Sequence, residues 1–178
     1  KMDINPQLIK IWDPFLPRGG LSKEEIVTAK AFLWKGHCSV HQMFQTEHIQ
    51  DFRSKYPNGK VISHPECNFD VCSNSDFVGS TEYIINTIKD SEPGSHWLVG
   101  TELNLVSRIA SEFRPLDKIV RFMSPLICNC STMNRISIDH LHNVLKNLEE
   151  GNVKNSIVVD DDIKQYAKLS IDRMLSLT

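Results

Sequence analysis

A histidine and a carboxylate follow one strand-like apolar run. Lys60–Ser63 leads into His64, Pro65 and Glu66. Two residues apart, the imidazole and the carboxylate point to the same side of the chain if it stays extended, and Pro65 favours that extension at His64. Because ligands of open α/β sheets bind at the carboxyl ends of strands, this pair is a candidate site. A surface turn is the alternative interpretation.

Two hydroxyl side chains follow a second run. Asp76–Val78 ends in a glycine, Ser80 and Thr81 at an expected helix start, where backbone amides, hydroxyls and the positive helix end favour a phosphate or carboxylate. An ordinary Ser80 N-cap fits the same residues. The run His96–Gly100 also ends in polar residues, up to Glu102, and carries less information on its own.

The cysteines form no local metal motif. None of the spacings between the five cysteines is Cys-x-x-Cys, so a zinc ribbon or a thioredoxin-like motif has no support. Cys38 and Cys130 each precede a segment that turns helical, which suits an iron–sulfur cluster held between separate structural units. Inert buried thiols are the alternative. The cysteines are Cys38, Cys67, Cys72, Cys128 and Cys130.

The elements that must position these residues alternate between strands and helices. That alternation predicts α/β units with a parallel sheet. The expected strands are Lys60–Ser63, Asp76–Val78, His96–Gly100, Lys118–Met123 and a buried Ser156–Val159. The expected helices cover 46–55, 81–89, 103–113, 139–150 and a last stretch that begins at the acidic residues 160–162.

Two helices show clear sequence signals. The helix over 139–150 has apolar residues at helical spacing, which we expect to face a core. Ser22 should cap an earlier helix with an apolar side that extends through residues 26–33. The apolar stripe of the first is Leu141, Val144, Leu145 and Leu148, and that of the second is Ile26, Ala29, Phe32 and Leu33.

Composition excludes several classes of protein. The 178 residues are 40% hydrophobic and 24% charged, with 20 basic against 22 acidic side chains, so neither a nucleic acid nor an anionic membrane is an expected partner. No apolar run is long enough for a membrane span, and the polar start is unlike a signal peptide. A chain of this length can bury a core without disulfides. We expect a cytoplasmic protein with reduced thiols.

Five motifs, in order along nearly the whole chain, resemble those of the quinolinate synthase family. They are Trp34–His41 (WKGHCSVH), Val61–Cys67 (VISHPEC), Asp76–Thr81 (DFVGST), Val99–Glu102 (VGTE) and Cys130–Met133 (CSTM). The resemblance implies condensation of iminoaspartate with dihydroxyacetone phosphate to quinolinate in NAD biosynthesis. It also implies a [4Fe–4S] cluster on three cysteines, and three αβα units around a pseudo-threefold axis with one cysteine per unit.

The resemblance assigns roles to individual residues. Cys38 and Cys130 match two cluster ligands, and Cys128 could replace Cys130, whereas Cys67 and Cys72 do not match. Glu66 matches the acid/base and iron-proximal carboxylate. The remaining matches are His41 and His64, which bind substrate, and Ser80 and Thr81, which bind its anionic group. Three thiolates leave one iron open as a Lewis acid, and histidines suit anionic substrates.

The amino-terminal unit of the family, with its cysteine and a catalytic tyrosine, has no match before Lys1. The chain therefore resembles a carboxyl-terminal part: 1–37 ends one αβα unit, 38–127 is a complete unit, and 128–178 is a β-α segment that completes the missing unit. We expect this part alone to be inactive. L-aspartate oxidase is the expected supplier of iminoaspartate. If a targeting segment precedes Lys1, the expected location is an organelle instead of the cytoplasm.

Two other functions are compatible with part of this sequence. One is a three-cysteine iron–sulfur enzyme of the diphthamide-biosynthesis type, against which the His-Pro-Glu-Cys and Gly-Ser-Thr motifs argue. The other is a non-catalytic metal-binding or interaction module, for which close Cys/His pairs are lacking. Visible absorption of the anaerobic protein separates an iron–sulfur protein from a zinc protein, because zinc is colourless.

Overall fold

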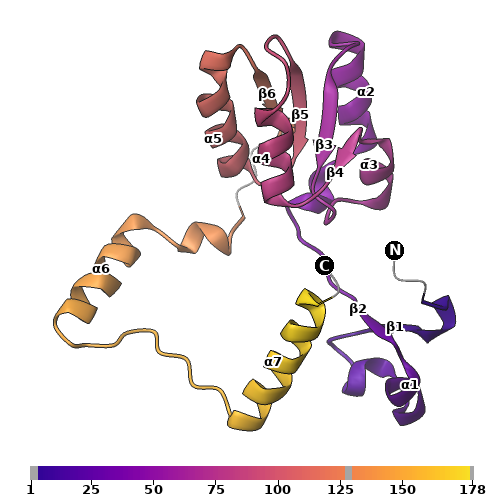
Figure 1. Cartoon of the computed structure of the whole chain (residues 1–178), viewed down its shortest axis with the longest axis vertical. Coiled ribbons are helices and arrows are strands. Elements are labelled where there is room, and N and C mark those ends of the chain that lie inside the picture. The colour runs from indigo at the N-terminus through magenta and orange to yellow at the C-terminus, as the bar shows by residue number, and fades with distance from the viewer. Residues whose placement is uncertain (1–3, 127–129, 177–178) are drawn as a thin grey trace. The chain divides into compact units, whose positions relative to one another are not determined.

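The computed structural model describes residues 4–126 and 130–176, and the chain divides into two compact units, Lys1–Ser131 and Thr132–Thr178 (Figure 1). The predicted boundaries after residues 37 and 127 stay predictions. None of the helices in these two ranges combines the length and apolar character that crossing a bilayer requires.

Unit Lys1–Ser131 is built on a four-stranded parallel sheet, which confirms the predicted α/β class. The strand order is β4-β3-β5-β6, and β3 pairs with β5 from Lys60 opposite Trp97 to Ser63 opposite Gly100. The four strands predicted in this unit are present, the outer two shorter than expected. Their bounds are β3 (Lys60–Ser63), β4 (Phe77–Val78), β5 (His96–Gly100) and β6 (Ile119–Phe122).

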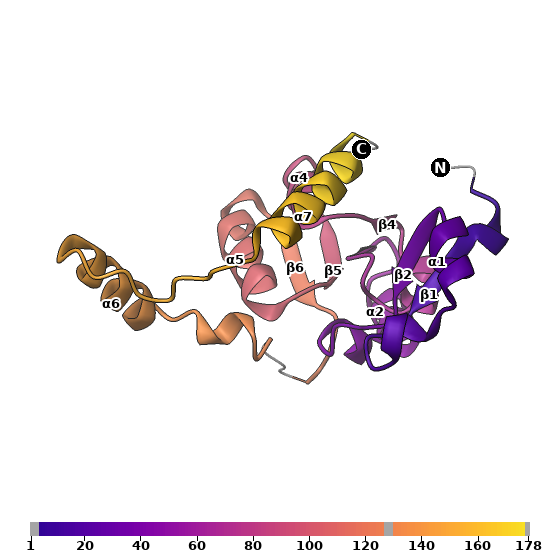
Figure 2. The same ribbon diagram turned by 90° about the horizontal axis from the view of Figure 1, so that it is seen from below.

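Helices cover both faces of this sheet, which makes a three-layer αβα unit. In Figures 1 and 2, α5 and α2 lie on opposite sides of β5. The helices are α2 (Thr46–Lys55) and α3 (Phe69–Asn74) on one face, and α4 (Thr81–Lys89) and α5 (Leu103–Phe113) on the other. Sequence analysis predicted three of them and missed α3, whose six residues are too few for a helical period to show.

Successive side chains along each strand point to opposite faces of the sheet, so they contribute to two separate hydrophobic cores. On β3, Val61 packs with α2 and α3, while its neighbour Ile62 packs with α4 and α5. Both side chains are fully buried. Each fully buried aliphatic side chain contributes about 1.5–3 kcal/mol to the stability of the folded state. The two cores therefore hold the sheet and the loops at its ends in place.

The amino-terminal segment corrects one prediction. Ser22 caps α1 (Lys23–Thr28) through a capping box with Glu25, but the helix ends at Thr28 instead of including Phe32 and Leu33. Those residues belong to β2 (Ala31–Trp34), which pairs in parallel with β1 (Ile9–Trp12). Pairing with β1 satisfies the backbone groups of this aromatic-rich run, a tertiary contact that overrides its helix-like spacing.

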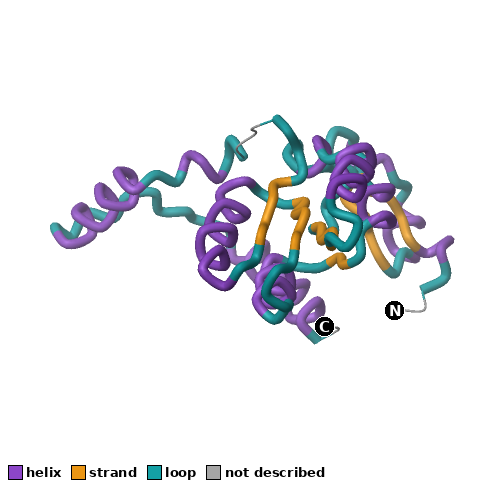
Figure 3. Tube along the Cα trace, turned by 90° about the horizontal axis from the view of Figure 1, so that it is seen from above, coloured by secondary structure: helices purple, strands orange, loops and turns teal. Residues whose placement is uncertain are grey.

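Unit Thr132–Thr178 holds two helices joined by a loop, which Figure 3 draws between them. The predicted helices are confirmed as α6 (Ile138–Glu149) and α7 (Asp161–Leu175). Short 3-10 helices complete the chain: Pro6–Leu8, Pro17–Gly20, His41–Met43, Arg114–Leu116 and Met133–Arg135.

Two predictions for this unit are wrong in the structure. Ser156–Val159 is not a strand, and its Ile157 and Val158 are almost fully exposed. The stripe of α6 is not core, because Leu141, Leu145 and Leu148 are about half-exposed. A strand needs a neighbouring strand and an apolar stripe needs a surface to cover it, and the described part of this unit supplies neither.

Candidate functional site

Four of the predicted site residues follow strands at the carboxyl edge of the parallel sheet: His64 and Glu66 after β3, and Ser80 and Thr81 after β4. The backbone N–H of His64, which follows β3, donates to the carbonyl of Gly100 at the end of β5 over 2.9 Å. The N–H of Gly79, which follows β4, donates to the carbonyl of Ser63 over 3.1 Å. These two bonds tie the ends of β3, β4 and β5 together.

A second loop, residues 35–45, brings Cys38 and His41 to this edge. It is anchored by Val40 and Phe44, whose side chains are buried in the core formed with α2 and α3. Residues 41–43 form a single 3-10 turn between these anchors. Because the anchors flank the turn, His41 is buried with them instead of projecting into solvent.

Cys38, His41 and Glu66 converge. One potential ligand atom from each lies within 4.8 Å of the other two, and Nδ1 of His41 is 3.2 Å from Oε2 of Glu66. Cys38 and Glu66 line a depression of about 600 Å³, together with Gln42 and Trp34. A thiol, an imidazole and a carboxylate form a donor set that binds transition metals.

His41 is the buried polar centre of this group. Within the described residues, neither ring nitrogen has a hydrogen-bond partner, because the approach to Glu66 is an ion-pair distance without hydrogen-bond geometry. Burial lowers the pKa of His41, nearby His64 lowers it further, and Glu66 opposes both. A buried, neutral imidazole without a partner is costly unless a ligand satisfies it, so the group fits a bound metal centre or substrate.

His64 stacks beside His41, with ring centroids 5.0 Å apart. Its Nδ1 accepts a hydrogen bond from the backbone N–H of Glu66 over 3.3 Å. A neutral imidazole that accepts at Nδ1 carries its proton on Nε2. His64 is therefore arranged to donate one hydrogen bond.

The cysteines occupy different environments. Cys130 is half-buried and packs, like Cys38 and Cys72, against the apolar core formed with α2 and α3, and its pairing with Cys38 as a ligand stays a prediction. Cys67 is buried, its thiol donates to the carbonyl of Gly100, and burial raises its pKa to about 12, which disfavours a metal-binding thiolate. Cys72 donates to the carbonyls of His64 and Cys67. Cys128 lies outside the described residues.

Ser80 and Thr81 stand at the start of α4. The Ser80 hydroxyl accepts from the N–H of Tyr83 over 3.3 Å, so Ser80 is the N-cap. Among the described residues, no hydrogen bond, ion pair or ring contact joins either hydroxyl to the Cys38 group. Glu102, at the end of the next strand, likewise caps α5 through the N–H of Leu105. The anion-binding role of Ser80 and Thr81 stays a prediction.

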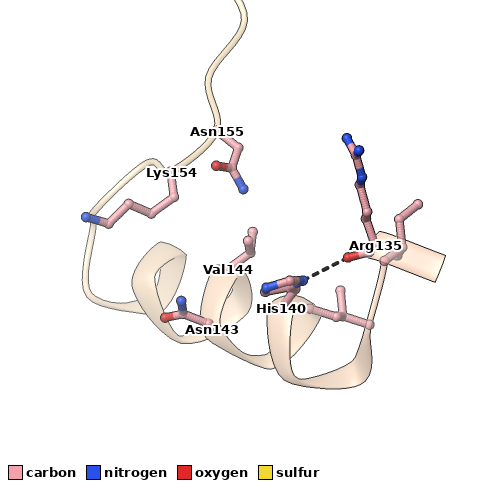
Figure 4. Close-up of a pocket in the computed structure, with 8 residues that line it drawn as sticks. Arg135, His140, Asn143, Val144, Lys154 and Asn155 are labelled. Carbon is pink, nitrogen blue, oxygen red and sulfur yellow. Dashed lines mark hydrogen bonds between the residues drawn. The ribbon is translucent and has the colours of Figure 1, made fainter. Parts of the chain in front are cut away.

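A separate depression of about 550 Å³ lies in unit Thr132–Thr178 (Figure 4). His140 is held there by a bond from Nδ1 to the carbonyl of Arg135 over 2.8 Å, while the Lys154 side chain extends away from it. The depression contains none of the predicted site residues. It adjoins the exposed face of α6.

Three residues at the site were not predicted to have a role there: Gln42 and Asn68 on the loops, and Trp34 at the end of β2. Gln42 and Trp34 line the depression, and the amide of Asn68 spans the two site loops. Gln42 follows His41 directly, which was an available signal. Asn68 gave none, because an asparagine before a short helix is usually an N-cap.

Comparison with known proteins agrees with these motifs. The family described as Quinolinate synthetase A protein matches residues 8–176. The chain is 47% identical over 177 residues to a quinolinate synthase of Herpetosiphon aurantiacus, covering 99% of this chain and 47% of that protein. It is 45% identical over 167 residues to one of Streptomyces coelicolor, covering 94% and 42% respectively. The chain thus spans slightly less than half the length of these relatives.

Proposed function

The chain belongs to the quinolinate synthase family, and on that premise we propose that it supplies the carboxyl-terminal part of an active site that condenses iminoaspartate with dihydroxyacetone phosphate. The products are quinolinate, phosphate and water. One observation carries the proposal: buried His41, without a hydrogen-bond partner among the described residues, faces Glu66 and Cys38 at the carboxyl edge of the sheet.

We further propose that Cys38 and Cys130 are two of three thiolate ligands of a [4Fe–4S] cluster. Both pack against one core, and His41 and Glu66 stand beside Cys38. The third thiolate would come from the part of the relatives that this chain does not span. Such a cluster, when bound, supplies Lewis acidity at an iron with an open position.

The side chains of this chain then bind substrate and move protons. Neutral His41 offers a hydrogen bond without a charge, and His64 donates from Nε2 to a substrate oxygen. Glu66 is more than half-exposed and lies within 3.2 Å of His41, so its carboxylate can accept a proton during enolisation and return it during dehydration. Ser80 and Thr81, at the amino end of α4, would hold the phosphate or a carboxylate.

The setting of the enzyme is part of the proposal. All four described cysteines are free thiols, which fits the reducing cytoplasm. Iminoaspartate is a reactive imine, so an L-aspartate oxidase is the proposed supplier. We propose that segment 128–178 completes a unit that begins in the part of the relatives outside this chain, giving three αβα units around a pseudo-threefold axis.

Quinolinate production tests this proposal. The chain is joined to the amino-terminal part of the Streptomyces coelicolor relative, reconstituted anaerobically and supplied with both substrates. We expect quinolinate from the chimera and none from the chain alone. A chimera that contains the cluster yet makes no quinolinate, beside an active intact relative, contradicts the assignment.

One competing function has a specific observation in its favour. The Cys38, His41 and Glu66 atoms are close enough to hold a single metal ion without any cluster. A colourless protein with one equivalent of zinc after anaerobic purification of the chimera would favour that metal-binding module.

A further inference from the structure

The candidate site is built from two loops with no strand or helix in common. Residues 35–45 carry Cys38 and His41, and residues 64–68 carry His64 and Glu66. The second loop is fixed to the sheet, because the N–H of His64 bonds to Gly100 and the N–H of Cys67 returns to the carbonyl of His64. What holds the first loop against it decides the geometry of the site.

Asn68 bridges the two loops. Its Nδ2 lies 3.5 Å from the carbonyl oxygen of Gln42 and 3.4 Å from that of Phe44, and donates to both. An amide nitrogen carries two hydrogens, one for each carbonyl. One accepting carbonyl, that of Gln42, lies inside the single turn His41–Met43, and the other, that of Phe44, follows the turn directly.

Because the Asn68 side chain bonds to the other loop, it does not cap its own helix, α3. Asn68 occupies the N-cap position of α3, where asparagine is among the preferred residues, yet its side chain makes no capping bond there. The side chain is half-buried and reaches across to the other loop. A residue with only a helix-starting role would instead satisfy the amides of α3.

We propose that Asn68 is a positioning residue that sets Cys38 and His41 against His64 and Glu66. It deepens the proposed function, on whose site it rests, and it touches neither substrate nor metal. The Phe44 side chain anchors one end of the turn in the core, and the Asn68 amide holds its backbone at two points. Partners that orient ligands in this way typically change metal affinity by about 10- to 100-fold when removed.

Cobalt binding tests the proposal on the full chain without turnover. Co²⁺ is titrated anaerobically, and its thiolate charge-transfer band reports binding at Cys38, as loss of the band in Cys38→Ser verifies. Asn68→Ser keeps a good N-cap but is too short to reach the carbonyls. We expect its Co²⁺ affinity to fall about 10-fold or more.

Asn74→Ser is the matched control, because Asn74 lies in the same helix and its Nδ2 donates to the carbonyl of Asp70 without reaching the site. Its Co²⁺ affinity should equal that of the unmodified chain. Equal affinity in Asn68→Ser and Asn74→Ser overturns the proposal. So does a loss in both variants that follows their melting temperatures.

Hydrogen exchange tests the role of Asn68 independently, whether or not the chain binds Co²⁺. The amides of Gln42 and Met43 bond to the carbonyls of Cys38 and Val40 within the first loop. Asn68→Ser should speed their exchange, and Asn74→Ser should not. Unchanged exchange in Asn68→Ser overturns the proposal. If the unmodified chain binds Co²⁺ but the chimera makes no quinolinate, the result counts against the proposed function and not against the positioning role of Asn68.

Discussion

Burial determines the protonation state of His41, and with it the chemistry that this side chain can perform. Its imidazole has little access to water, and burial is the main cause of its lowered pKa, so the ring is neutral at pH 7. The nearby Glu66 carboxylate stays largely in solvent and keeps contact with bulk protons. One buried neutral group and one exposed acidic group are suited to binding and to proton transfer respectively.

Glu66→Gln should slow quinolinate formation by the chimera about 100-fold or more, because an amide cannot accept a proton. The fold should tolerate the change, since the Glu66 side chain is more than half-exposed. Steady-state kinetics and the visible spectrum are measured together. A normal rate with an intact cluster would remove Glu66 from the proton transfers.

The Cys67 thiol should resist alkylation in the folded chain. Burial raises its pKa to about 12, so at pH 8 the reactive thiolate is a very small fraction of the folded protein. Unfolded cysteine ionises near pH 8.5, so this group also makes the folded state less stable as the pH rises above that value. Mass spectrometry after timed iodoacetamide treatment should find Cys67 modified last. Modification as fast as at half-buried Cys72 would contradict its burial.

At the level of elements, two hydroxyls at the start of α4 have separable roles. Ser80→Ala removes the cap on Tyr83 and should cost about 1 kcal/mol in the free energy of unfolding. Thr81→Val keeps the shape and should leave stability nearly unchanged. If Thr81 binds the anionic group, its loss should weaken quinolinate binding to the chimera about ten- to a hundredfold. Denaturant titration and quinolinate titration separate the two roles, and unchanged affinity in Thr81→Val would leave an ordinary helix start.

Elements with a local signature could be predicted from sequence. The short β-branched run of Val61 and Ile62 marks β3, and the Ser22 capping box marks the start of α1. Elements that depend on a distant partner could not. Phe32 joins a strand because β1 lies beside it, and Ile157 stays outside a sheet because no described strand pairs with it.

The same distinction applies to the site. His64 and Glu66 could be inferred from their place after a strand, whereas the approach of Cys38 and His41 to Glu66 requires the fold of a separate loop. Family resemblance supplied those residues before the structure brought them together. Asn68 could not be found either way, because its partners are backbone carbonyls of residues that show no pattern in sequence.

At the level of the whole molecule, the unit Thr132–Thr178 has no buried residue in its described part. Isolated helices of 12–15 residues are marginal in water. The amides of α6 and α7 in the chain alone should therefore exchange with deuterium far faster than those of β3 and β5. In the chimera, the exchange of these amides should be slower if the amino-terminal part covers the apolar faces of α6 and α7. Equal protection of α6 and β5 in the chain alone would show that the unit is stable by itself.

Anaerobic iron–sulfur reconstitution of the chimera tests the central claim most directly, by iron content and the cubane absorption and Mössbauer spectra. We predict about four iron atoms per chimera, loss of the cluster in Cys38→Ser and in Cys130→Ser, and retention in the matched control Cys72→Ser. The chain alone, with two of the three proposed thiolates, should hold no stable cubane. A full cluster in the chain alone, or in both Cys38→Ser and Cys130→Ser chimeras, would contradict the account.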